Sequence, residues 1–156
     1  MQRATNRDGS VGDQDLLLAT LESFATLKRD RAATNVTDYL ANQYSTVTPW
    51  WVPGTGAAIL RLRPAQVATP DGASRVARLD AAIAADHARM VLSMHRNGNA
   101  VDIAELRLVE RLTADAHTLR ASMFRQGRAL RPVGLLNGIR ATVYPLSQLA
   151  RGLRGR

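Results

Sequence analysis

The residue types best suited to metal or acid–base chemistry in this 156-residue chain are three histidines, His87, His95 and His117. On helices, His87 and His117 would both point inward from apolar faces. The carboxylates that could meet them there are Asp86, Glu105, Glu110 and Asp115. Di-iron sites in helical bundles need a carboxylate three residues before a histidine, so that both side chains reach the metal from one face. No Asp or Glu stands three residues before any of these histidines. His87 and His117 are therefore predicted to be structural, and no metal or other cofactor is expected.

Other catalytic arrangements are also weak. Gly54-Thr55-Gly56 resembles the start of a phosphate-binding loop, but no Gly-Lys-Ser/Thr follows it and no clear strand precedes it. No serine stands in a nucleophile-elbow motif. The chain has no cysteine, which excludes disulfides, thiolate metal sites and cysteine nucleophiles. These observations favour a non-enzymatic protein over a small helical enzyme.

The charge of the chain is concentrated at its C-terminal end. The formal net charge is +8 at pH 7. All thirteen carboxylates lie at or before Asp115, whereas eight arginines and no carboxylate follow His117. Such a concentration of positive charge predicts an anionic partner: an acidic protein surface, nucleic acid or an anionic membrane. The predicted anion-binding residues are Arg128, Arg131, Arg140, Arg151, Arg154 and Arg156.

The same region has the pattern of an amphipathic helix. Pro132 stands at a favourable first-turn position, and Arg140 is the one charged residue between Pro132 and Ala150. Apolar residues recur there every three or four positions, which predicts a docking face made of Leu136, Ile139, Val143 and Leu146. Residues 128–156 are therefore predicted to be a basic amphipathic C-terminal segment that contacts the partner.

The periodicity of the central region predicts a pair of helices. Ser74 is a good N-cap, and apolar residues at helical spacing follow it as far as Met94. Asn97-Gly98-Asn99 is typical of a helix C-cap and turn. A second helix is predicted over 102–126. The short turn between the two predicts an antiparallel αα-hairpin.

Residues 45–73 interrupt the helical pattern with four prolines and three glycines. They are predicted to form a long Pro/Gly-rich arm. Within it, the alternation of Leu60 and Leu62 with arginines favours a short strand. Trp50 or Trp51 is expected to anchor the arm to the helices.

The predicted fold is therefore all-α, with four to five helices built on the central hairpin, the long Pro-rich arm and a basic C-terminal helix. Further helices over 13–31 and after residue 34 would precede the arm. Residues 1–12 are polar and are predicted to be a flexible tail. The length is that of one domain, so residues 13–156 are expected to form a single helical domain.

Two parts of the chain are loosely similar to a known family. His117, Phe124 and the run Arg128-Ala129-Leu130-Arg131-Pro132 resemble the second helix and the following membrane-facing segment of the di-iron hydroxylases of ubiquinone biosynthesis. Ser74–His87 is similar to the first ligand helix of that family. The glutamates that would bind iron are missing at the matching positions. The resemblance therefore implies a degenerate member that lacks the usual iron site.

These patterns together predict a small helical binding or assembly protein whose Arg-rich C-terminus docks on an anionic surface, with an acidic protein or a second copy of the chain as partner. The alternatives are a nucleic-acid-binding accessory protein, and a peripheral membrane protein or degenerate di-iron-like helical enzyme. Residues 1–14 lack the apolar core of a secretory signal. A cytoplasmic location is therefore expected, with association at a membrane in one alternative.

Overall fold

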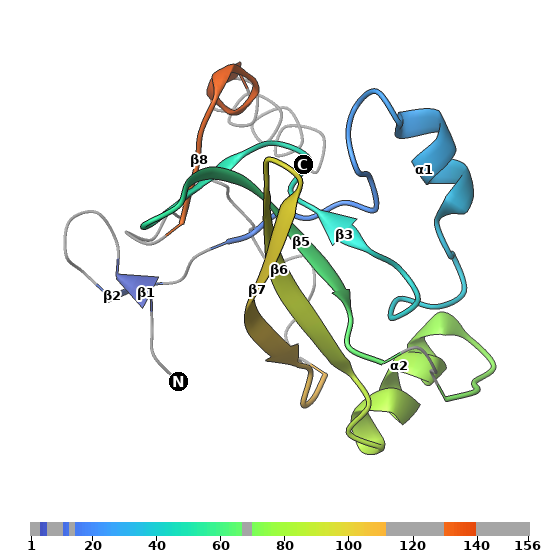
Figure 1. Cartoon of the computed structure of the whole chain (residues 1–156). Helices are drawn as coiled ribbons and strands as arrows, with labels where there is room; N and C mark the ends of the chain where they lie inside the picture. Colours follow the sequence, from blue (N-terminus) through green and yellow to red (C-terminus); the bar gives the residue numbers. More distant parts are fainter. Residues whose placement is uncertain (1–3, 6–10, 13–14, 67–69, 112–129, 140–156) are drawn as a thin grey trace, which may run out of the picture. The chain divides into compact units, whose positions relative to one another are not determined.

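The computed structural model describes residues 4–5, 11–12, 15–66, 70–111 and 130–139. In that part of the chain the main element is an antiparallel sheet of six strands (Figure 1), in the order β7-β6-β5-β4-β8, with β3 pairing separately with β5. The bounds of its strands are β3 Tyr44–Ser45, β4 Trp50–Val52, β5 Gly56–Pro64, β6 Arg89–Arg96, β7 Asn99–Arg107 and β8 Arg131–Pro132. The prediction of an all-α helical bundle is therefore wrong.

The helices are short. Within the described ranges they are α1 (Leu27–Ala33), α2 (Arg75–Ala84) and a helical segment at residues 135–139. Two short strands, β1 (Ala4–Thr5) and β2 (Val11–Gly12), pair antiparallel with each other within the N-terminal part predicted to be a flexible tail.

The chain divides into two compact units. The first unit comprises Met1–Leu17, Thr48–Ala58 and Ala121–Arg156, and the second comprises Leu18–Val47 and Ile59–Arg120. The strand β5 contributes its first three residues to the first unit and the rest to the second. Both β4 and β5 lie within residues 45–73, so the region predicted to be a long Pro-rich arm contains two strands of the sheet.

In the second unit, the predicted αα-hairpin is a β-hairpin. β6 and β7 pair antiparallel, with Arg96 opposite Asn99. The two residues between them, Asn97 and Gly98, have φ angles of 51° and 80°. A two-residue turn in which both residues have positive φ matches the right-handed twist of the flanking strands, and Asn-Gly is its favoured sequence. The turn was predicted at the correct place, but the elements on both sides of it were assigned to the wrong class.

The helix that follows Ser74 is confirmed at its start and is shorter than predicted. The Ser74 side chain accepts a hydrogen bond from the Ala77 N–H. Asp86 then has a φ of 57°, and the N–H groups of Asp86 and His87 donate to the carbonyls of Ile83 and Ala82. This is the Schellman arrangement that ends helices, with an aspartate in the left-handed position that glycine usually occupies.

The strand predicted from the alternation of Leu60 and Leu62 is confirmed and extends over the whole of β5. Leu60 and Leu62 are 0% and 8% exposed, whereas Arg61 and Arg63 point to the more exposed face. Across β6, Met90 and Leu92 continue the same buried face, opposite Pro64 and Leu62. These apolar residues form the core of the second unit.

At the edge next to β6, β7 is exposed along its whole length. All nine of its residues are exposed, and among the described strands it pairs only with β6. The register jumps between Leu92 and Ser93, whose partners are Ala104 and Asp102, so that Ile103 is an extra residue in a β-bulge.

The helices predicted over 13–31 and after residue 34 are also wrong for most of their length. Phe24 and Leu27 are 50% and 45% exposed, so they do not form the buried face of an amphipathic helix. Between the end of α1 and β3, the Asn35 Oδ1 accepts hydrogen bonds from the N–H groups of Thr37 and Asp38. Asp38 in turn accepts from the N–H of Leu40. Such side-chain bonds to nearby backbone compete with helix formation.

The first unit is organised around β4. Trp50 lies opposite Ala58 of β5 on one side and Pro132 of β8 on the other. Trp50 is 1% exposed and Trp51 is 41% exposed, so β4, which lies between β5 and β8, carries one buried and one partly exposed indole. Pro49 and Pro53 flank β4, where their missing N–H groups interrupt no ladder. The prolines therefore mark the ends of a strand and do not indicate an arm.

Candidate docking surface and polar pocket

One buried asparagine fixes the helical segment 135–139 in the first unit. Asn137 is 6% exposed. Its Nδ2 donates to the carbonyls of Pro49 and Val133 at 3.0 and 2.8 Å, and its Oδ1 accepts from the Thr48 hydroxyl at 2.9 Å. Thr48 is itself 1% exposed. Every polar atom of this amide thus has a partner, which a buried amide needs in order to be stable.

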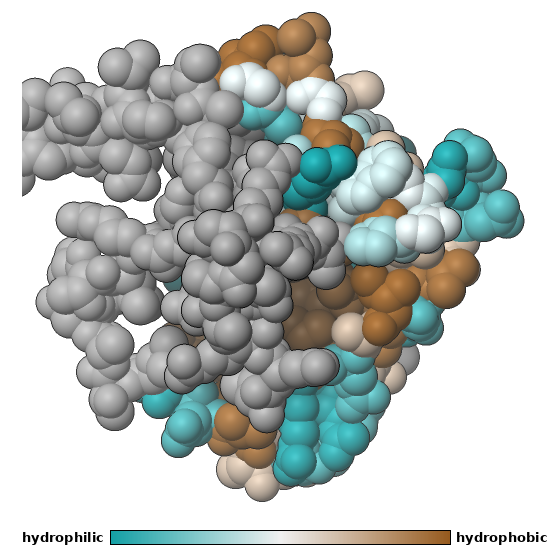
Figure 2. Space-filling view, turned by 90° about the vertical axis from the view of Figure 1, so that its left-hand side faces the viewer, coloured by the Kyte–Doolittle hydropathy of each residue, from teal (hydrophilic) through white to brown (hydrophobic). Residues whose placement is uncertain are grey.

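On the same segment the apolar side chains are exposed. The fractional exposures of Leu135, Leu136 and Ile139 are 81%, 50% and 51%. Figure 2 shows apolar residues protruding at the top of the view, at the height where Figure 1 draws this segment. The segment Arg131–Ile139 is called the docking segment below. It buries a polar residue and exposes apolar ones, which is the reverse of a helix that packs on its own protein.

The docking segment begins with an arginine held over an aromatic ring. The Arg131 guanidinium lies 5.5 Å from the centroid of the Trp51 ring, a cation–π contact. Its Nε is buried and has no hydrogen-bond partner among the described residues. Arg131 also forms no ion pair with a carboxylate in the part of the chain that the structure describes. The Arg131 guanidinium is therefore held in place by Trp51, and no Asp or Glu of the described residues neutralises its charge.

The sequence-predicted site residues are described only in part. Arg131, Leu136 and Ile139 belong to the docking segment, and Trp50 and Trp51 to β4. Others lie outside the described residues, namely His117, Arg128, Arg140, Val143, Leu146, Arg151, Arg154 and Arg156. The expectation that His87 faces inward from a helix is wrong, because α2 ends before it and its side chain is exposed.

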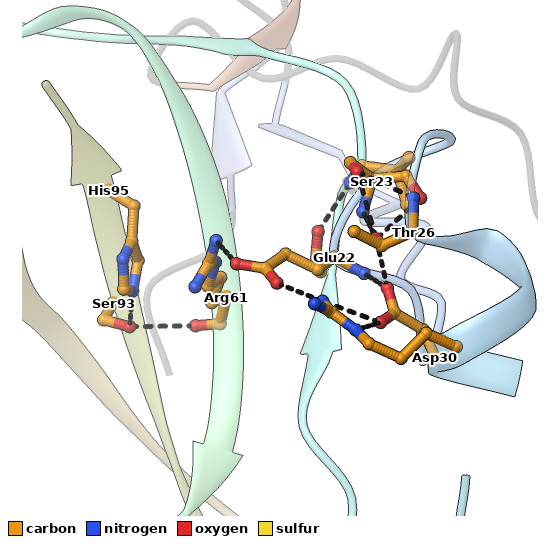
Figure 3. A network of polar contacts seen from close by, with 10 residues as sticks. Glu22, Ser23, Thr26, Asp30, Arg61, Ser93 and His95 are labelled. Carbon is orange, nitrogen blue, oxygen red and sulfur yellow. Dashed lines mark hydrogen bonds and ion pairs between the residues drawn. The ribbon is translucent and has the colours of Figure 1, made fainter. Parts of the chain in front are cut away.

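In the second unit, a network of charged groups surrounds Glu22 (Figure 3). The Glu22 carboxylate lies between two guanidinium groups, at 3.0 Å from Arg29 Nη2 and 2.8 Å from Arg61 Nη2. The Glu22 N–H donates to the Asp30 Oδ2 at 2.7 Å, and the Thr26 hydroxyl donates to the same oxygen at 2.6 Å. The hydrogen bond from Thr26, followed by that from Glu22, holds the pKa of Asp30 below its ordinary value.

On β6, which pairs with the strand β5 that carries Arg61, a serine and a histidine are in contact. Ser93 Oγ lies 3.0 Å from His95 Nε2 and 3.4 Å from the Arg61 carbonyl oxygen. Burial, assisted by the charge of Arg61, lowers the pKa of His95. A serine beside a neutral histidine is the start of a nucleophile–base pair. Ser93 is only 2% exposed, however, so a substrate cannot reach its hydroxyl, and the contact is structural.

Next to Glu22 lies a pocket of about 240 Å³. Its walls come from the segment before α1, from α1 and its C-cap, from the segment leading into β3, from β3 itself, and from β5. The lining residues are Thr20, Leu21, Glu22, Asp30, Ala33, Thr34, Ala41, Asn42, Gln43, Tyr44, Ser45 and Arg61. Sequence reasoning missed this site, because Glu22 and Arg61 meet only after the strand β5 has formed.

The described residues contain neither a metal-binding cluster nor a membrane-spanning helix. No group of three or more His, Cys, Asp or Glu residues in that part could hold a metal ion. No helix there has both the length and the apolar character needed to cross a membrane.

Comparison with known proteins adds no further information on the site. No protein-family model, no curated protein and no solved structure matches the chain. The function must therefore be inferred from the chain's own residues.

Proposed function

We propose that the chain is a non-enzymatic binding or assembly protein that docks on an acidic protein surface through its C-terminal segment. The observation that supports this most directly is the docking segment. Asn137 fixes it to the loop before β4, and Leu135, Leu136 and Ile139 remain exposed on it. Exposed apolar groups of this kind on an ordered segment mark protein–protein contacts.

The charge of the region supports an acidic partner. Residues 116–156 contain eight arginines and no carboxylate. Among them, Arg131 is stacked on Trp51, and arginine and tryptophan are enriched among the residues that dominate interface energies. A partner carboxylate would supply the ion pair that Arg131 does not form within the described part of the chain.

The proposal is tested with a double substitution on the docking segment, Leu136→Ser with Ile139→Ser. The matched control is Val36→Ser, which replaces an apolar residue of the second unit that is 72% exposed. Proteins crosslinked to each variant in the native source are identified by mass spectrometry. We expect an acidic partner with the wild type and the control, and its loss from the double variant.

Three outcomes would contradict the proposal. In the first, the double variant retains the partner. In the second, the purified chain binds duplex DNA or RNA at physiological salt, and replacing Arg151, Arg154 and Arg156 with Gln abolishes that binding while the double variant retains it, which indicates a nucleic-acid-binding protein. In the third, it binds vesicles containing phosphatidylglycerol and the double variant does not, which indicates a membrane surface as the target.

A further inference from the structure

The pocket beside Glu22 belongs to the second unit, whereas the docking segment belongs to the first. Its volume of about 240 Å³ lies just below the range of roughly 300–1,000 Å³ that is typical of sites for drug-sized molecules. The pocket therefore suits a small ligand. Nine of its twelve lining residues carry polar or charged side chains, while much of the exposed lining surface is apolar. A ligand that fits must therefore combine polar groups with an apolar face, and the charges of the lining residues indicate of which kind it is.

An anionic ligand does not fit these walls. Two carboxylates, those of Glu22 and Asp30, line the pocket, against the single guanidinium of Arg61. That guanidinium is already paired with Glu22, so an added anion would have to compete with a carboxylate for it.

A cationic ligand is disfavoured for a different reason. Glu22 already has two arginine partners. The Asp30 Oδ1 accepts from Arg29 at 3.2 Å, and its Oδ2 accepts from Thr26 and from the Glu22 N–H. A cation would therefore meet carboxylates whose charge is already compensated.

Several N–H donors of Arg61 have no acceptor among the described residues. A guanidinium has five N–H donors, and the described residues accept from Arg61 only at Nη2, through Glu22. Its Nε is shielded from solvent and makes no hydrogen bond among the described residues. A ligand cannot reach the shielded Nε, but the unused Nη donors of Arg61 can donate to an acceptor oxygen in the pocket. The Glu22 oxygens, each of which already accepts from one arginine, can accept a second hydrogen bond. A hydroxyl group meets both needs, because it accepts and donates at once.

The walls that face these groups are fixed in advance. The Asn42 side chain donates to the carbonyls of Asn35 and Asp38 and accepts from the Asn35 N–H. The Tyr44 hydroxyl donates to the Tyr39 carbonyl at 2.7 Å, and burial raises the pKa of Tyr44. These two side chains are used internally and give the pocket its shape.

We propose that this pocket binds a small neutral polyhydroxy compound, of the size of one sugar ring or a cyclitol, with Arg61 and Glu22 as the residues that contact its hydroxyl groups. Such a ligand adds no charge to a compensated site. Its hydroxyls pair with Arg61 as acceptors and with Glu22 as donors.

The test uses myo-inositol and D-glucose as probes, added to the ¹⁵N-labelled full chain and followed by NMR at the arginine Nε–H signals. We expect saturable shifts at Arg61 with at least one probe. Arg61→Lys keeps the charge next to Glu22 and removes the planar fork, and it should weaken binding by about tenfold or more, the cost of one hydrogen bond to a charged group. Arg63→Lys is the matched control, because Arg63 lies two residues along β5 and pairs with Asp102 instead.

Should Arg61→Lys fail to fold, Glu22→Gln decides, because it keeps the shape of the side chain but removes the charge and replaces one acceptor oxygen by an NH2 donor; it should weaken binding of the polyol. The proposal is overturned if neither polyol shifts the Arg61 signals. It is also overturned if the pocket variant binds as well as the Arg63 control. Finally, saturable binding of inorganic phosphate or acetate at Arg61, with both polyols inactive, would show an anion site in its place.

Discussion

The docking segment and the polar pocket differ in which kind of side chain they expose. In the docking segment the polar residue, Asn137, is buried and satisfied, and the apolar residues are exposed. Around the pocket the charged residues lie at the surface and compensate one another, as Glu22 does with Arg29 and Arg61. Exposed apolar surface gains free energy when a large partner covers it, whereas a compensated polar hollow gains by exchanging water for a small polar ligand. The two regions thus suit different classes of partner.

The largest expected effect is a difference in stability between alanine variants of the two tryptophans of β4. This strand pairs with β8, where the docking segment begins. Trp50→Ala should lower the free energy of unfolding by about 3–5 kcal/mol, because it removes a fully buried aromatic side chain. Trp51→Ala should cost far less, since Trp51 is 41% exposed. Denaturant unfolding followed by circular dichroism measures both. Equal midpoints for the two variants would show that Trp50 does not carry the core of the first unit.

The next effect concerns the polar anchor of the docking segment. Asn137→Leu leaves the buried Thr48 hydroxyl and the carbonyls of Pro49 and Val133 without this partner. Each buried hydrogen bond that is lost costs about 0.5–1.5 kcal/mol, so the unfolding midpoint should fall. Asn99→Leu, at an exposed position of β7, is the control and should change stability little. An unchanged midpoint for Asn137→Leu would mean that the segment is not held by this amide.

The smallest effect lies beside the pocket and depends on pH. The pKa of His95 is lowered, mainly by burial, so the unfolded chain takes up a proton at this residue before the folded chain does. Stability is therefore complete above the ordinary histidine pKa of about 6.5 and declines as pH falls through the lower folded value. His95→Gln should flatten this decline, and His87→Gln at an exposed position should not. Thermal unfolding between pH 7 and pH 5 gives the comparison, and a slope that His95→Gln leaves unchanged would refute it.

Some local features of this fold could be predicted from sequence because neighbouring residues determine them. The Ser74 cap, the turn at Asn97-Gly98 and the alternation at Leu60 and Leu62 are of this kind. The class of β6 could not be predicted in the same way. Met90 and Met94 are four residues apart, which fits one face of a helix and one face of a strand equally well. The turn type should have decided between them, since Asn-Gly favours a hairpin over a helix end.

The candidate sites show the same difference between features set by neighbouring residues and features set by distant ones. Arg131, Leu136 and Ile139 were named from charge and spacing, because they lie close together in the chain. The pair of Glu22 and Arg61 could not be named, because it depends on the segment before α1 lying beside β5. The left-handed Asp86 was also beyond sequence reasoning, since aspartate only occasionally adopts the conformation that glycine takes freely.

The exposed strand β7 has a consequence for hydrogen exchange. In an antiparallel pair, successive N–H groups of a strand point alternately toward the neighbour and away from it. Because β7 pairs only with β6 among the described strands, every second amide of β7 faces away from that ladder and exchanges with water without any opening of the β6–β7 ladder. The bulge at Ile103 inserts one residue, so the alternation of slow and fast amides shifts by one position there. The order of fast and slow amides along the nine residues of β7 should therefore report the register in which β6 and β7 pair.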